Sequence, residues 1–94
     1  MNKFFDNLSG LWVEAAERRG AKIEPPQLDP QIAEELLELA RVAAHTQERR
    51  FAPLTSYMAG VAVSRLAVID PGTDVAAFVR EVREKLEAAA PNER

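Results

Sequence analysis

A histidine, two adjacent arginines and a Thr-Ser pair lie close together in this chain, and these side chains are suited to binding an anion. They are His45, Arg49, Arg50, Thr55 and Ser56. The two hydroxyl groups fall near the expected start of a helix, where unpaired backbone N–H groups and the helix dipole favour negative charge. Each guanidinium adds donors in a plane that matches phosphate or carboxylate oxygens. One interpretation is therefore a binding site for an anionic small molecule. No glycine-rich loop accompanies it, which excludes a nucleotide-binding P-loop.

The same side chains also have a purely structural interpretation. Thr55 or Ser56 can cap the helix that follows, and the arginines can balance the dipole of the helix that precedes. His45 can bond a nearby carbonyl oxygen. The substitution Arg49→Ala separates the two interpretations, because it abolishes binding in the first and weakens the fold in the second.

The chain does not offer a recognisable catalytic set. General acid–base catalysis needs groups that converge in a pocket, and a single histidine near Glu48 is too little. A pairing of His45 with a neighbouring hydroxyl has no evident oxyanion hole, and the acidic pair Glu34-Glu35 is expected to be solvated surface. With one histidine and no cysteine, the chain does not supply the roughly four ligands of a structural zinc site. We therefore expect a non-enzymatic protein with no metal and no cofactor.

The composition indicates which kinds of partner and which cellular location to expect. The net charge is −3 with both signs interspersed, whereas a nucleic-acid binder presents a clustered basic surface. The most apolar stretch, residues 51–69, contains Arg65, so it is expected to be a buried helix rather than a membrane span. The first residues lack the long apolar core of a signal peptide. We expect a cytoplasmic protein with no nucleic-acid partner and no membrane contact.

Apolar residues recur at helical spacing along the whole chain and predict four helices. Their expected ranges are residues 3–19, 30–50, 53–69 and 71–89. Gly20 is a natural stop for the first helix, and Asp-Pro pairs at 29–30 and 70–71 are typical helix starts. The predicted fold class is all-α, a compact four-helix bundle with short connections, formed by one domain over residues 1–94.

The expected core and the expected assembly follow from the same pattern. The predicted core residues are Leu36, Leu39, Val61, Phe78 and Val82. The third helix is apolar on nearly all sides, which predicts a central, buried position. A chain this short buries a small core, and Phe4, Phe5 and Trp12 crowd near its N-terminus. Burying these aromatic rings between subunits would add stability, so we expect a homo-oligomer.

The central stretch LARVAAHTQERRFAPLTSYMAGVA resembles a small bacterial domain of unknown function. The resemblance is carried by five short elements: Leu39-Ala40-Arg41, Ala44-His45, Glu48-Arg49, Ala52-Pro53-Leu54-Thr55 and Gly60. The chain departs from the pattern at Arg50-Phe51, where a Pro-Ala type pair is expected. Proteins of this kind occur alone or fused to molybdopterin-guanine dinucleotide biosynthesis transferases. The resemblance implies an accessory or interaction domain with a protein partner in molybdenum-cofactor biosynthesis, and it carries over no catalytic residue. The alternative is an anion-binding module or weak enzyme at the junction of the second and third helices.

Overall fold

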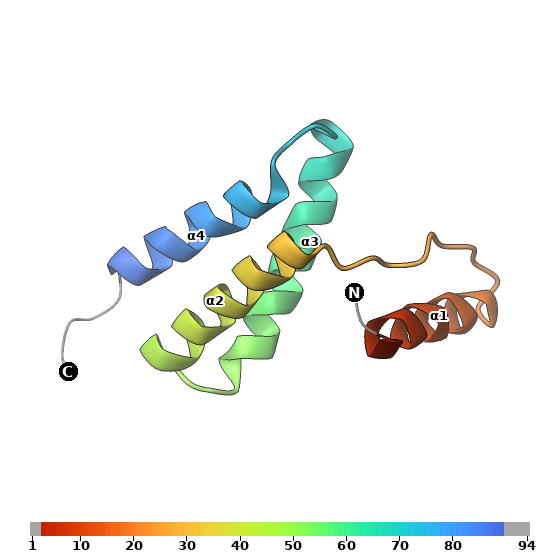
Figure 1. Ribbon diagram of the computed structural model, residues 1–94, viewed down its shortest axis with the longest axis horizontal. Helices are drawn as coiled ribbons and strands as arrows, with labels where there is room; N and C mark the ends of the chain where they lie inside the picture. Colours follow the sequence, from red (N-terminus) through yellow and green to blue (C-terminus); the bar gives the residue numbers. More distant parts are fainter. Residues whose placement is uncertain (1–2, 90–94) are drawn as a thin grey trace. The chain divides into compact units, whose positions relative to one another are not determined.

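Helices are the only regular secondary structure over the residues that the computed structural model describes, 3–89 (Figure 1). The four helices are α1 (Lys3–Glu17), α2 (Pro30–Thr46), α3 (Phe51–Ile69) and α4 (Val75–Ala89). No strand occurs within this described range. The all-α, four-helix prediction is confirmed.

The chain divides into two compact units, and the boundary along the sequence falls between Pro30 and Gln31. The first unit comprises α1 and the connector that follows it. The second begins at Gln31 and contains α2, α3 and α4. The prediction of one domain over residues 1–94 stays a prediction.

The first unit shows why α1 ends where it does. Gly20 adopts a φ of 79°, a left-handed conformation that residues with a Cβ avoid. The Ala21 N–H then donates to the Ala16 carbonyl at 3.0 Å, which satisfies a carbonyl that the helix end leaves open. The predicted stop at Gly20 is confirmed. The helix itself ends at Glu17 rather than at residue 19, because the residues after it form the turn.

The second unit is built from three helices joined by two short turns, residues 47–50 and 70–74. The chain reverses direction at each turn (Figure 1). The helices α2 and α4 therefore run in the same direction, and α3 runs in the opposite one. Its buried apolar residues come from α2 and α4 alone: Leu39, Val42, Ala43, Ala76 and Val79. The core of the second unit is therefore formed by side chains of α2 and α4, and α4 also contacts α3.

This arrangement corrects part of the predicted core. Leu39 is buried, with 2% of its surface exposed, and Leu36, Val61 and Phe78 are partly buried. Val82 is 49% exposed, so its assignment to the core is wrong. The predicted central position of α3 is also wrong, since none of its residues is buried. Apolar composition predicts that a helix needs cover, but it does not say which neighbour supplies that cover.

Three further helix boundaries differ from the predicted ones. The helix α2 ends at Thr46 instead of residue 50, and α3 begins at Phe51 instead of residue 53. Pro53 is tolerated inside the first turn of α3, because the first N–H groups of a helix have no partner within it. The helix α4 begins at Val75 instead of residue 71, because the carboxylate of Asp74 accepts the Ala77 N–H at 3.1 Å and so caps it.

Candidate functional site

The five predicted anion-binding residues are spread over the end of α2, the turn and the start of α3. His45 lies in the last turn of α2 and is exposed, as are Arg49 and Arg50 in the turn. Thr55 and Ser56 are partly buried in the second turn of α3, not in its first. The side chains of His45 and Arg49 make no hydrogen bond or ion pair with the described residues.

Two of these side chains are already engaged locally. The Arg50 guanidinium donates to Glu48 Oε1 at 2.7 Å and lies 5.8 Å from the centre of the Phe51 ring. The Thr55 hydroxyl donates to the Phe51 carbonyl at 2.9 Å. Glu48 therefore compensates the charge of Arg50, and Thr55 does not cap α3. Among the five residues, Arg49 and His45 retain the most freedom to bind an anion.

The backbone amides at the start of α3 are largely occupied. The Phe51 N–H donates to the Glu48 carbonyl at 3.0 Å, and the Ala52 N–H donates to the Arg49 carbonyl at 3.1 Å. Pro53, the third residue, has no N–H. The N–H groups that could bind an anion at a helix N-terminus therefore already donate hydrogen bonds to carbonyl groups of the turn. Any anion bound here depends on side chains.

Charged side chains join α2 to α4 across the second unit. The Arg80 Nε donates to Glu35 Oε2 at 3.0 Å, and Arg83 Nη2 lies 3.7 Å from Glu35 Oε1. Arg41 and Glu87 extend this link, with 3.9 Å between their nearest charged atoms. The side chains of Glu35 and Arg83 are only 16% and 19% exposed. The expectation that Glu35 is solvated surface is wrong, whereas its neighbour Glu34 is exposed.

An open apolar groove lies beside this link, between α2, α3 and α4. Its volume is about 230 Å³. Its lining residues are Leu39, Thr55, Met58, Ala59, Ala62, Phe78, Val79, Val82 and Leu86. Thr55 is the one polar side chain among them, and its hydroxyl is already bonded within α3. The groove offers no group for catalysis or charge recognition, so it suits an apolar side chain or helix face.

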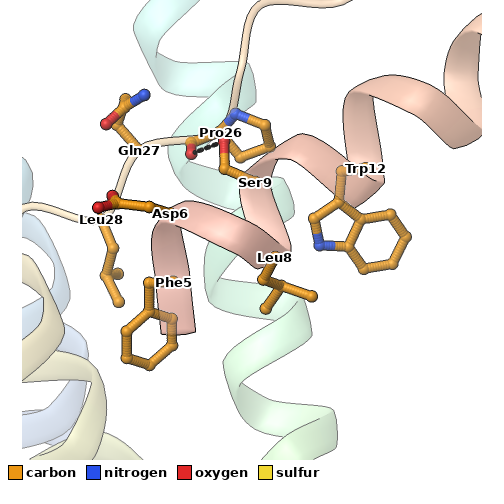
Figure 2. Close-up of a pocket in the computed structure, with 8 residues that line it drawn as sticks. All are labelled: Phe5, Asp6, Leu8, Ser9, Trp12, Pro26, Gln27 and Leu28. Atoms are coloured by element: carbon orange, nitrogen blue, oxygen red, sulfur yellow. Dashed lines mark hydrogen bonds between the residues drawn. The ribbon is translucent and has the colours of Figure 1, made fainter. Parts of the chain in front are cut away.

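A second pocket, of about 300 Å³, lies within the first unit between α1 and the connector. Figure 2 shows how the connector is held: the Ser9 hydroxyl donates to the Pro26 carbonyl at 2.8 Å. The side chains of Phe5 and Leu28 lie on one side of this bond, whereas the Trp12 indole points away from the connector. Trp12 and Phe4 are more than half exposed. The first unit therefore leaves part of its aromatic stripe uncovered.

The sequence contained signals for the residues that were missed. Ser9 lies in register with Phe5 and Trp12 on the apolar stripe of α1, and a lone hydroxyl at such a position needs an acceptor. Arg83 follows Ala76 and Val79 at helical spacing, so it occupies a position on the buried stripe of α4. A largely buried arginine requires carboxylate partners, and Glu35 at 3.7 Å and Glu87 at 3.4 Å supply them. No group of three or more residues able to hold a metal ion occurs within the described range 3–89.

The fold and surface define a small all-α domain with an apolar groove and an exposed apolar helix. The chain belongs to the family described as Domain of unknown function (DUF6457), whose profile matches residues 7–94. No curated protein and no solved structure matches the chain.

Proposed function

We propose that this chain is a non-enzymatic interaction domain that works as an accessory to molybdenum-cofactor biosynthesis. The observation that carries the interaction role is α3: it is the most apolar helix of the chain, yet none of its residues is buried. Exposed apolar surface of this extent marks a contact with another protein. The pathway is suggested by the resemblance to domains fused to molybdopterin-guanine dinucleotide biosynthesis transferases, since a fused domain and its neighbour share a task.

The proposal includes a cytoplasmic location, a homo-oligomeric state and no nucleic-acid partner. The helix α3 is long and apolar enough to span a membrane by length and composition. Arg65 lies within it, and short turns link it to two helices that carry ion pairs. These features favour a protein-covered helix over a membrane span. Exposed large apolar side chains on both α1 and α3 support self-association.

The test is a direct binding measurement with a molybdopterin-guanine dinucleotide biosynthesis transferase from the same source. Isothermal titration calorimetry of the full chain should detect binding, and Met58→Glu should weaken it at least about tenfold by placing a charge in the groove. Gln31→Glu, at an exposed position on α2, should bind like the natural chain. Absence of binding at about 100 µM would remove the pathway assignment.

The second candidate is an anion-binding module or weak enzyme at the α2–α3 junction. The observation that favours it is the free, exposed guanidinium of Arg49 one turn after His45. Titration with inorganic phosphate, followed by amide chemical shifts, should then move signals around residues 45–50. Arg49→Ala should abolish these shifts while the melting temperature stays within a few degrees, because an exposed guanidinium contributes at most about 1 kcal/mol. A sharp fall in melting temperature would instead make Arg49 a structural residue.

A further inference from the structure

We propose that two copies of this chain associate through the outer face of α3, with the two α3 helices antiparallel about a two-fold axis near Val61. This inference rests on the proposed interaction role and names one surface and one partner for it. The outer face is the set of exposed or partly exposed residues Leu54, Tyr57, Met58, Val61, Arg65, Val68 and Ile69. Met58 lies at the edge that this face shares with the groove.

The first support is the pattern of exposure on this face. Tyr57, Met58 and Val68 are 73%, 71% and 83% exposed. Leu54, Tyr57, Val61 and Val68 follow one another at spacings of three, four and seven residues, so they form one line along the helix. This is the spacing with which two helices pack side chains between each other. None of the residues in this line is buried, and only Val61 is partly covered.

The second support is the self-complementary distribution of charge. Between Phe51 and Ser64, α3 has no charged residue, and Arg65 is its only one. Arg65 is exposed and has no ion pair or hydrogen bond from its side chain to the described residues. A two-fold axis at Val61 places Arg65 opposite Tyr57 of the second copy, four residues on either side of the axis. A guanidinium over a tyrosine ring is an attractive cation–π contact.

The ends of the helix complement each other in the same arrangement. Arg49 and Arg50 precede α3, and Asp70 follows it; all three are exposed. An antiparallel pair brings Arg49 of one copy, whose side chain has no ion pair within the described residues, beside the aspartate of the other, and it opposes the two helix dipoles favourably. A parallel pair would place arginine beside arginine. A two-fold contact also closes on itself, so it gives a dimer and not a filament.

The available area fits a dimer of modest affinity. The exposed parts of the five large apolar side chains on this face sum to about 400 Å² per copy, on the areas that such side chains bury. A standard interface buries about 800 Å² per partner, so a face of this size fits a weak, transient contact. Dissociation in the micromolar range is therefore expected.

The experiment is sedimentation velocity on the full chain from about 1 to about 300 µM. The natural chain should change from monomer to dimer across this range. Tyr57→Lys places a cation opposite Arg65 of the second copy and should raise the dissociation constant at least about tenfold. The double variant Tyr57→Lys with Arg65→Glu should recover most of that loss. Within one copy these positions lie roughly 12 Å apart along the helix, so recovery reports a contact between copies.

Each other outcome counts against the inference. If the natural chain stays monomeric over the whole concentration range, the inference is overturned. If Tyr57→Lys in that case abolishes binding of the transferase, α3 contacts the transferase and the proposed function stands. A dimer that survives Tyr57→Lys but dissociates with Trp12→Ser assigns the interface to α1. Loss without recovery in the double variant overturns the antiparallel arrangement. Circular dichroism must show equal helix content for all variants, and Gln31→Lys serves as the matched surface control.

Discussion

Replacing Glu35 by alanine should destabilise the chain far more than the same change at the adjacent Glu34. Glu35 is the only carboxylate within ion-pair distance of both Arg80 and Arg83 among the described residues. Its removal leaves Arg83, which is 19% exposed, with only the half-exposed carboxylate of Glu87 at 3.4 Å. The guanidinium then lacks compensation for most of its lost hydration.

The expected loss of unfolding free energy depends on how much of each ion pair is exposed to solvent. The pair with Arg80 is half solvated and contributes about 0.5–1 kcal/mol. Removing one partner of a fully buried pair costs about 3–5 kcal/mol; the partial exposure of Arg83 reduces this to about 1–1.5 kcal/mol. The sum is about 2 kcal/mol, which lowers the melting temperature of a domain this size by about 8–16 °C.

Thermal unfolding followed by circular dichroism tests this expectation. Glu34→Ala is the matched control, and a change at its exposed position should stay within about 0.5 kcal/mol. A double-mutant cycle that combines Arg83→Ala with Glu35→Ala should give a coupling energy of about 1 kcal/mol. The same cycle with Glu34→Ala should give none. Equal melting temperatures for the two glutamate variants would refute the role of Glu35 in holding α2 to α4.

Three further substitutions test other parts of the fold. Leu39→Ala should cost about 3 kcal/mol of unfolding free energy in a denaturant titration, whereas Val82→Ala should cost less than about 1 kcal/mol; similar losses would contradict their different burial. Gly20→Ala should cost about 1 kcal/mol, because alanine resists a positive φ, and faster amide exchange at the end of α1 would show it. Ser9→Ala leaves the Pro26 carbonyl without its donor and should speed tryptic cleavage after Lys22; unchanged cleavage would mean that the connector is held by other contacts.

Much of the fold could be predicted from local signals. The helical spacing of apolar residues gave four helices, and Gly20 and Pro30 marked a helix end and a helix start, because their backbone preferences act within a few residues. Asp74 was overlooked as the cap of α4, since the Asp-Pro pair at 70–71 carries a similar signal. Sequence patterns alone do not show which of two candidate capping residues is used when either can accept a hydrogen bond from the first turn of the helix.

The site was harder to predict because it depends on which helices face each other. The role of Glu35 requires knowing that α4 lies beside α2, and the spacing of α2 alone places it at the edge of the apolar stripe. The exposure of α3 is a similar case: its composition indicates a need for burial, but the buried apolar residues of the second unit lie on α2 and α4. The residues at the α2–α3 junction remain candidates for anion binding on chemistry alone.

The bond between Glu35 and Arg80 also bears on how the chain folds. These residues are 45 positions apart, so joining them closes a loop at an entropic cost of about 3 kcal/mol. The turns before and after α3 are much shorter, and each pair of consecutive helices can form at lower cost. We therefore expect the α2–α4 contact to form last, after the transition state. Its ion pairs should scarcely change the folding rate, but they should slow unfolding and so set the lifetime of the native state.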